Sequence, residues 1–467
     1  MSVLLDRPHR VRRGSPSSRV RLLAAVAALF TFDGAVFGSW AARIPDVTTQ
    51  VGASHTTLGL ALLCVSVGAL ASMQLAGALC ARLGAGLVAG ASAVLICVAV
   101  ALPGLARSLP ELAAALLAFG AATGAVNVAA NSAGVRIEAA GNRPIMPGLH
   151  AAFSFGGLLG AALGGLASGL GPVAPHLLVV AGVGLLLTAV IAPVLVGGDV
   201  EQRPADAADA ERADVAHPER TRAITASRQL LVVLGLIAGC TAYGEGAITD
   251  WGALHLRETL AATPAVAAAG YAAFSLAMAC GRLAGVRLVR SVGATHVLVY
   301  GSALAATGML AAAFAPAVAV ALGGFALVGL GLANVFPLAI ARAGSLGGSK
   351  GVALASTVGY TGLLGGPPLI GLLVGGVGLP SALATVSLLA AVAAGLSLYA
   401  TPQRALLHAR VTAALDAGRE RAVAGLTPAV VRYGPSVRRW ADDLTLLGAT
   451  TPGPARTLSP IAAIYLP

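Results

Sequence analysis

Long stretches of apolar residues, separated by short polar or Gly- and Pro-containing segments, dominate this sequence. A helix needs about 20 apolar residues to cross the hydrocarbon core of a bilayer. The stretches have that length, and they lack the alternating segments of about ten residues that form a membrane β-barrel. The pattern therefore predicts twelve transmembrane helices. We place them at residues 21–45, 55–80, 86–106, 109–134, 146–170, 174–196, 229–254, 264–286, 294–315, 317–341, 350–377 and 380–400.

The composition excludes a soluble protein. Hydrophobic residues make up 57% of the chain and charged residues only 10%, whereas a soluble domain carries about 25% charged residues. The 60 glycines suit helices that pack closely in lipid. The five cysteines are scattered through apolar stretches without the spacing of metal ligands. We therefore expect no metal, no cofactor and no disulfide framework.

The net charge of +11 is better explained by membrane orientation than by binding of nucleic acid. Only three of the 30 Lys and Arg residues, Arg43, Arg107 and Arg257, lie at one end of the predicted spans. The other 27 lie in the two tails, the central loop and the loops on the same side. Basic loops face the cytoplasm, so we expect a multi-pass protein of the plasma (cytoplasmic) membrane with both termini inside. The basic N-terminus runs straight into a full-length span, so no cleavable signal peptide is expected.

Two polar regions divide the chain. We predict a cytoplasmic N-tail at 1–20, a six-helix half at 21–197, a cytoplasmic linker at 198–228, a second six-helix half at 229–401 and a cytoplasmic C-tail at 402–467. The linker is rich in mixed charge and proline, which favours disorder. The C-tail contains apolar and basic residues at helical spacing, so a helix on the inner membrane surface and a disordered tail are both open.

The two halves repeat each other in parallel order. The matches are Asp33-Gly34 with Glu245-Gly246, Trp40 with Trp251, Arg82-Leu83-Gly84-Ala85 with Arg290-Ser291-Val292-Gly293-Ala294, Asn127-Val128 with Asn334-Val335, and residues 155–161 with 360–366. Each match is weak alone, but all fall on corresponding spans. Parallel six-helix repeats place a substrate site between the halves near the middle of the membrane.

With these motifs, the chain resembles the major facilitator superfamily across residues 20–400. DGAVFGSWAARIP, LHAAFSFGGLLGA, EGAITDWGALHLRE and GRLAGVRLVRSVGA resemble a bacterial inner-membrane branch related to the fucose permeases. The resemblance implies the major facilitator fold and alternating access between two rocking halves, often coupled to protons. The chain also departs from the superfamily, because Ala81 stands where an aspartate is usual in the loop after the second span. The fifth span lacks the proline of the antiporter signature, and these differences argue against a standard drug/proton antiporter.

Two acids inside the apolar spans are the main candidates for function. Asp33 lies about twelve residues into its span, or ~18 Å deep at 1.5 Å per residue, and Glu245 lies just past the middle of the seventh span. A carboxylate in lipid must be neutralised, paired or hydrated. A proton carrier, a ligand for substrate hydroxyls and a structural hydrogen bond all fit. Asp250 lies farther out, where a structural role is expected and Arg257 is a candidate partner. Arg43 could neutralise an anionic substrate, but a local pair with Asp46 is expected.

Other polar and aromatic residues in the spans complete the predicted substrate- or proton-binding set. They are Trp40, Trp251, Asn127, Asn131, Asn334, His150 and Tyr360. The tryptophans could stack on a sugar or lie at the membrane interface. The asparagines could line a cavity or join helices by hydrogen bonds, and the histidine could relay protons or bond a loop carbonyl.

These features predict a secondary active transporter of a small solute, driven by proton symport. A sugar-like substrate follows from the resemblance. The alternative is proton-driven efflux of hydrophobic or drug-like compounds, and a receptor or scaffold without transport fits less well because it has no need of symmetric intramembrane acids. No phosphate-binding loop and no H-E-x-x-H motif occurs, so we expect no enzyme. The expected partners are a small molecule, protons and the bilayer, and the expected state is a monomer.

Overall fold

The structure is a computed structural model that describes residues 16–141, 145–202 and 220–400. Helices account for nearly all of these ranges, and no strand occurs in them. The helices are α1 (Pro16–Val51), α2 (His55–Leu83), α3 (Ala85–Leu105), α4 (Leu109–Gly141), α5 (Met146–Ser168), α6 (Val173–Gln202), α8 (Arg220–Glu258), α9 (Pro264–Val292), α10 (Ala294–Ala313), α11 (Val318–Leu332) and α12 (Val335–Tyr399). The prediction of an all-α membrane protein is confirmed.

Eleven helices in the described ranges are long and apolar enough to cross a bilayer. The last of them, Gly351–Tyr399, has 49 residues, more than twice the length that one crossing needs. α12 contains two glycines with non-helical backbone, Gly348 and Gly378, which fall where the sequence predicts breaks between spans. Gly378 has a φ of 78° and precedes Pro380, as in a turn. The number twelve itself stays a prediction.

Several predicted boundaries differ from the structure. α1 does not end at Pro45 but continues to Val51. The hydroxyls of Thr48 and Thr49 donate to the carbonyl oxygens of Ile44 and Pro45 at 2.7 and 3.0 Å. α6 and α8 extend into the predicted linker from either side. Residues 203–219, and the C-tail with its predicted surface helix, lie outside the described residues.

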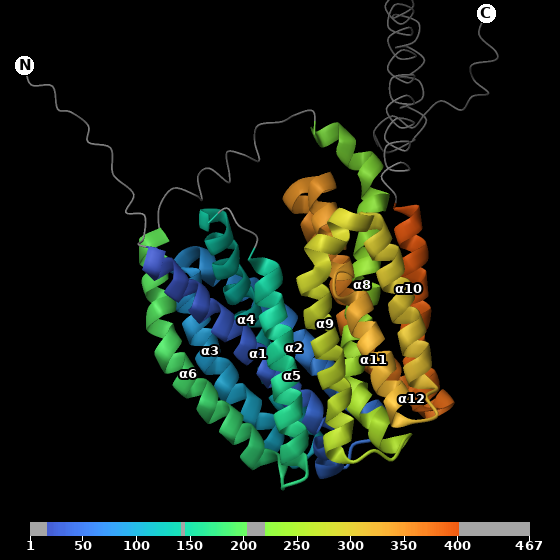
Figure 1. Cartoon of the computed structure of the whole chain (residues 1–467). Helices are drawn as coiled ribbons and strands as arrows, with labels where there is room; N and C mark the ends of the chain where they lie inside the picture. Colours follow the sequence, from blue (N-terminus) through green and yellow to red (C-terminus); the bar gives the residue numbers. More distant parts are fainter. Residues whose placement is uncertain (1–15, 142–144, 203–219, 401–467) are drawn as a thin grey trace, which may run out of the picture. The chain divides into compact units, whose positions relative to one another are not determined.

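The described helices form two groups, α1–α6 and α8–α12, which lie side by side in Figure 1. In the first half α1 packs against α5, α2 against α4, and α3 against α6. In the second half α8 packs against α12, while α11 packs against α9 and α10. The halves meet along two lines, where α5 contacts α9 and α2 contacts α12. We call these two lines the seam.

The turn that follows the second helix of each half has the same backbone geometry. Gly84, between α2 and α3, has φ 98° and ψ 147°, and Gly293, between α9 and α10, has φ 86° and ψ 151°. Each glycine N–H donates to the carbonyl oxygen four residues earlier, at Cys80 and Val289. Positive φ favours glycine because a Cβ is disfavoured there. The repeated Gly-Ala of the sequence therefore marks equivalent turns in the two halves.

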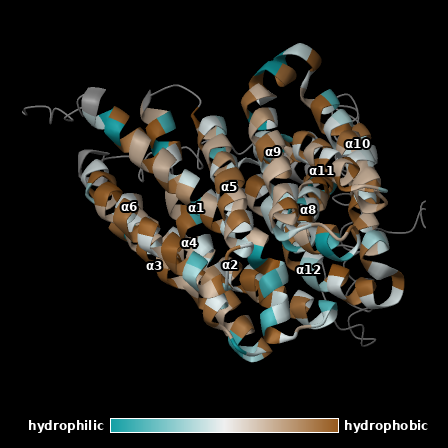
Figure 2. Cartoon of the chain, turned by 60° about the horizontal axis from the view of Figure 1, so that its bottom comes forward, coloured by the Kyte–Doolittle hydropathy of each residue, from teal (hydrophilic) through white to brown (hydrophobic). Residues whose placement is uncertain are grey.

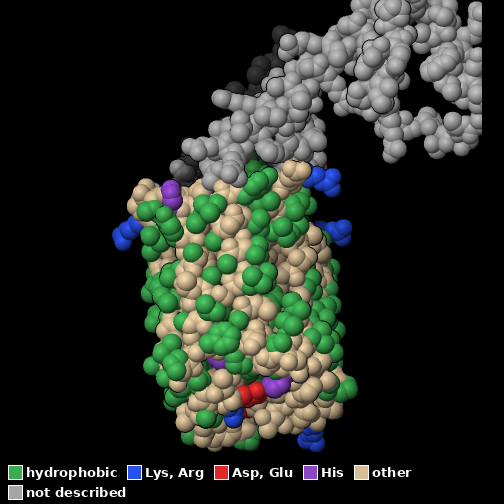
Figure 3. Space-filling view, turned by 90° about the vertical axis from the view of Figure 1, so that its right-hand side faces the viewer, with side chains coloured by type: hydrophobic (Ala, Val, Ile, Leu, Met, Phe, Trp, Pro, Cys, Tyr) green, Lys and Arg blue, Asp and Glu red, His purple; other side chains and the backbone are tan. Residues whose placement is uncertain are grey.

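The outer wall is apolar, as a protein surface in lipid must be. Leu186 and Val190 on α6 are 73% and 72% exposed, and Leu388 on α12 is 65% exposed. Hydrophobic residues cover most of each helix in Figure 2. On the face in Figure 3 the side is hydrophobic, whereas the Lys and Arg side chains lie near the two ends. This distribution matches a bundle that spans a bilayer.

Glycines let α1 and α5 approach each other closely. A Cβ at Gly34 would lie 1.9 Å from the carbonyl oxygen of Phe153. From the other side, a Cβ at Gly156 would lie 1.9 Å from the carbonyl oxygen of Thr31. Both distances are far below van der Waals contact, so the two backbones touch where these glycines are. Small residues are the usual means of such close packing in membranes.

We expect Gly156→Val to destabilise the protein by at least about 2 kcal/mol, because the new side chain must push α1 and α5 apart. The measurement is thermal unfolding of the purified protein in detergent. The control is Gly182→Val on α6, where an added Cβ meets nothing within 4 Å. Equal melting temperatures for the two variants would contradict the close α1–α5 contact.

Candidate functional site

Asp33 lies in the middle of α1 and is almost completely buried, with 4% of its surface exposed. Its Oδ1 atom has no hydrogen-bond partner in the part of the chain that the structure describes. The next residue, Gly34, holds this part of α1 against α5. A carboxyl oxygen is thus buried without a donor, an arrangement that a purely structural acid would rarely leave.

Glu245 of α8 has a cation beside it. Nη2 of Arg282, on α9, lies 3.8 Å from Glu245 Oε1. Nη1 of Arg282 reaches across the seam to α5, donating to Ser154 Oγ at 2.8 Å and more weakly to the His150 carbonyl oxygen at 3.4 Å. Arg282 therefore connects the acid of the second half to the first half.

Sequence reasoning missed Arg282 as a site residue, since it used this arginine only in the count of charges that sets the orientation. The available signal was its position inside the predicted span 264–286. An arginine within a span almost always faces the interior of the bundle.

Tyr271 of α9 joins the two acids into one electrostatic environment. Glu245, Arg282 and Asp33 all lie close enough to Tyr271 to influence it electrostatically. A Cβ on Gly157 of α5 would lie 3.0 Å from Ser275 Oγ and 3.4 Å from the Tyr271 hydroxyl oxygen, so this part of α9 packs directly on α5. We call Asp33, Glu245, Arg282, Tyr271 and Ser154 the central cluster.

The two predicted tryptophans are buried among helices. Trp40 is 2% exposed and lies 6.1 Å from Phe119 between ring centroids. Trp251 is 0% exposed and stacks on His55 at 6.3 Å, and its Nε1 has no acceptor among the described residues. Neither indole is open to a ligand in this conformation. Stacking on a substrate stays a prediction.

The three asparagines do not share one environment. Asn334 Nδ2 donates to the Gly281 carbonyl oxygen at 2.8 Å, which joins the start of α12 to α9. Asn131 donates to the Asn127 carbonyl oxygen one turn earlier on α4, at 2.8 Å, and Asn127 is exposed. Asn334 thus joins helices, whereas Asn127 and Asn131 contact each other on α4.

His150 and Tyr360 complete the predicted set. The His150 ring lies edge-on to Phe30 of α1 at 5.4 Å, and its backbone carbonyl belongs to the Arg282 contacts. Tyr360 lies half-buried on α12. No group of three or more His, Cys, Asp or Glu side chains that could hold a metal ion occurs in the described ranges.

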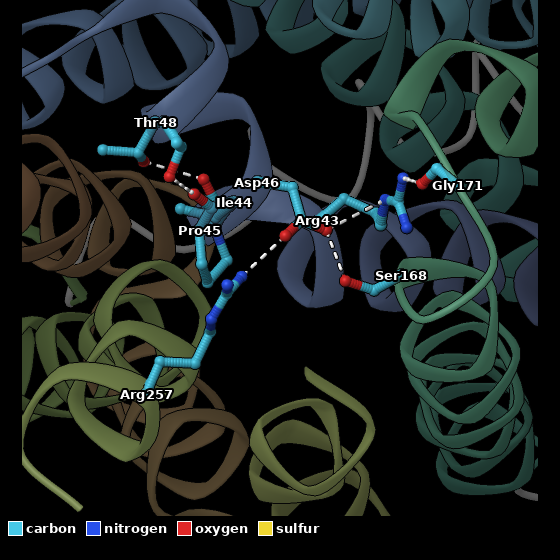
Figure 4. A network of polar contacts seen from close by, with 9 residues as sticks. Arg43, Ile44, Pro45, Asp46, Thr48, Ser168, Gly171 and Arg257 are labelled. Carbon is cyan, nitrogen blue, oxygen red and sulfur yellow. Dashed lines mark hydrogen bonds and ion pairs between the residues drawn. The ribbon is translucent and has the colours of Figure 1, made fainter. Parts of the chain in front are cut away.

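A second polar network joins the halves where α1 ends and α2 begins, which we call the closed end (Figure 4). The Asp46 carboxylate receives Arg257 Nη1 of the second half at 2.6 Å and Ser168 Oγ of α5 at 2.5 Å. Arg43 Nε lies 3.3 Å from the same carboxylate, so the predicted Arg43–Asp46 pair is confirmed. The predicted pairing of Arg257 with Asp250 is wrong, because Arg257 points across the seam to Asp46.

Further contacts close the seam at the same end. His55 Nε2 of α2 lies 2.7 Å from Glu258 Oε2 of α8. Thr56 Oγ1 donates to the Gly371 carbonyl oxygen of α12 at 3.1 Å. Farther along α2, Ser66 Oγ donates to the Leu363 carbonyl oxygen at 3.2 Å. The α2–α12 side of the seam is therefore joined from the closed end inward.

Comparison with known proteins agrees with this architecture. The sequence profile of the Major Facilitator Superfamily matches residues 23–353. The chain is 32% identical to an uncharacterized MFS-type transporter of Yersinia pestis over 349 residues, which cover 73% of this chain and 86% of the relative. It is also 32% identical to the membrane protein MosC of Rhizobium meliloti over 365 residues, or 77% and 86% of the two chains.

Solved structures share the fold at low sequence identity. A bacterial homolog of the human lysosomal transporter Spinster, in an inward-facing and occupied conformation, superposes with a TM-score of 0.61 at 14% identity. The superposition covers 83% of this chain and 97% of that one. The nucleoside transporter NupG superposes with a TM-score of 0.58 at 13% identity, covering 81% and 98%.

The profile match and the two relatives extend over most of the chain, and the fold and the two joined halves agree with them. The resemblance to the fucose-permease branch stays a prediction. The expectations of a membrane transporter, and of a protein that is not an enzyme, are confirmed at the level of the family. The chain belongs to the Major Facilitator Superfamily.

Proposed function

We propose that this transporter moves a small polar solute by alternating access and couples the movement to protons. The observation that carries the proposal is the central cluster, in which one intramembrane acid from each half shares an environment with Arg282 and Tyr271 at the seam. Superfamily transporters with parallel repeats bind substrate between their halves. A sugar-like solute is the first candidate class, because the resemblance points to it and the polar groups of the cluster are suited to hydroxyls.

Asp33 is the proton carrier in this proposal. It is buried, and no described residue donates to its Oδ1. A carboxylate in such surroundings is costly without a cation, whereas the protonated acid is neutral. When the halves rearrange and water reaches α1, the proton can leave. Asp33 thus has the features of a group that loads in one conformation and unloads in the other.

Glu245 and Arg282 take a different role, namely binding the solute. Arg282 supplies a compensating charge 3.8 Å from Glu245, which lowers the cost of an ionised carboxylate inside the bundle. The same arginine donates to Ser154 of α5. A solute that bonds Glu245 or Arg282 competes with these contacts and thereby changes how α9 is held to α5. Binding of the solute is in this way connected to movement at the seam.

The closed end supplies the second element of alternating access. In the predicted orientation it faces away from the cytoplasm. To open it, the Asp46–Arg257 and His55–Glu258 pairs must separate, because each joins one half to the other. These pairs hold the halves together at one end while the solute exchanges at the opposite end.

The solute is first identified by thermal shift of the purified protein with sugars, nucleosides, carboxylates and lipophilic cations at two pH values. Stabilisation by sugars or nucleosides supports the proposal. Stabilisation by lipophilic cations alone would instead favour efflux of hydrophobic compounds. The solute found is then used in proteoliposome assays.

We expect Asp33→Asn to abolish accumulation driven by a pH gradient and to retain counterflow exchange without a gradient, since only coupling needs the proton. Asp250→Asn is the matched control, because Asp250 is an acid in the same kind of span and is not among the groups that interact with Tyr271. Gradient-driven accumulation by Asp33→Asn at the wild-type level would contradict the coupling role.

We expect Glu245→Gln and Arg282→Gln each to raise the solute concentration for half-maximal counterflow by about tenfold or more, the effect of losing a charged hydrogen bond. The double variant is expected to need no higher solute concentration for half-maximal counterflow than the more impaired of the two single variants, because the two groups act together. Unchanged half-saturation in both single variants would remove this pair from the solute site.

We expect Asp46→Asn to populate the conformation in which the closed end is open. The measurement is the rate of maleimide labelling of a cysteine introduced at Thr56, in a protein whose five native cysteines are replaced. Labelling should rise several-fold, and Glu111→Gln, which removes an acid at the same end outside the network, should leave it unchanged. A wild-type labelling rate in Asp46→Asn would mean that the network does not hold this end closed.

A further inference from the structure

The network at the closed end contains more positive than negative charge. Arg43 and Arg257 both contact Asp46, so two guanidinium groups share one carboxylate. The shorter contacts of the Asp46 carboxylate are the hydrogen bonds that it accepts from Arg257 Nη1 at 2.6 Å and from Ser168 Oγ at 2.5 Å. Its contact with Arg43 Nε is longer, 3.3 Å, and lacks hydrogen-bond geometry. Arg43 is therefore the less compensated of the two arginines.

Arg43 is also fully buried, with 0% of its surface exposed. Nη2 donates to the Gly171 carbonyl oxygen at 2.8 Å, Nε has only the ion-pair contact with Asp46, and Nη1 has no partner in the described residues. Figure 4 shows the guanidinium extended toward Gly171, which precedes α6. A buried cation with an unused donor nitrogen is costly unless an acceptor lies beside it.

A second group with the same property lies next to Arg43. Nδ1 and Nε2 of His176, in the first turn of α6, are both buried and have no partner among the described residues. His176 interacts electrostatically with Arg43. The start of α6 adds the partial positive charge of a helix N-terminus. The unpartnered Nη1 of Arg43 and the unpartnered ring N–H of His176 thus belong to one region that carries excess positive charge.

We propose that a monatomic anion of the size of chloride binds between Arg43 and His176, where α1, α5 and α6 meet. Arg43 and Arg257 carry two positive charges against the one negative charge of Asp46, so a single bound anion balances the sum. Gly164 of α5 faces both His176 and Ala42, the residue next to Arg43. A Cβ at Gly164 would lie 2.8 Å from the Ala42 Cβ and 3.3 Å from His176 Cε1. Neither the transported solute nor proton coupling is needed for this site.

The anion also favours one conformation. While the closed end is closed, Arg257 shares the Asp46 carboxylate with Arg43. When the halves separate, Arg257 moves away and Arg43 becomes the remaining ion-pair partner of Asp46. The positive charge of Arg43 is then balanced by Asp46, and the site carries no excess charge. The anion therefore binds more tightly to the closed end in its closed form, and by linkage it stabilises that form.

The first experiment is diffraction from crystals of the wild-type protein grown in bromide, with data collected at the bromine absorption edge. We expect an anomalous peak within hydrogen-bond distance of Arg43 Nη1. A water alone at this position, or bromide peaks only elsewhere on the protein, would overturn the proposal. Because this experiment uses the wild-type protein, it does not depend on how well any variant folds.

The second experiment compares the melting temperature in sodium chloride and in sodium gluconate at equal ionic strength, which keeps screening the same. Chloride should raise the melting temperature of the wild type in a saturable manner. Arg43→Gln should lose the chloride effect, and Arg257→Gln should weaken the apparent affinity by about tenfold because it removes the excess charge. Arg107→Gln, an exposed arginine at the same end, should respond like the wild type. Equal responses of Arg43→Gln and Arg107→Gln would contradict the site.

Discussion

Polar groups inside a bilayer have to find their partners within the protein, and several of the partners in this chain come from the opposite half. Asp46 of the first half receives Arg257 of the second, and Arg282 of the second half donates to Ser154 of the first. Each contact gives a partly buried charge a partner and at the same time connects the halves. Any movement of one half against the other must therefore exchange these partners, and this ties charge to conformation.

The distance between neighbouring helix backbones limits which helices can move against each other. Within the first half, α1 and α5 meet backbone to backbone through Gly34 and Gly156, and such a contact cannot slide without a clash. Across the seam, α5 meets α9 through side chains such as Arg282 and Ser154, and also through backbone, since a Cβ at Gly165 would lie 3.3 Å from the Ala265 carbonyl oxygen. The α2–α12 line is close as well, because a Cβ at Gly59 would lie 2.7 Å from the Pro367 carbonyl oxygen. The seam in this conformation is therefore tightly packed, and its side-chain contacts are the ones that can be exchanged for others.

The repeat in the sequence is visible in the backbone but not in every side chain. Gly84 and Gly293 form equivalent turns because positive φ restricts both positions in the same way. Asn127 and Asn334 match in sequence, yet only Asn334 donates to a neighbouring helix, through Gly281. Backbone geometry is a local property and is conserved by the repeat. Side-chain partners depend on the neighbouring helix, and the neighbours of the two halves have different residues.

The sequence by itself determined the membrane class, the position of nearly every helix and the two intramembrane acids, because bilayer thickness and the cost of burying charge act on each segment separately. It also predicted the local Arg43–Asp46 pair, which lies within one turn of α1. It could not assign Arg257 to Asp46, or show that Arg282 belongs to the central cluster. Those contacts join different helices, and only the packing of α1, α5, α8 and α9 decides which side chains meet.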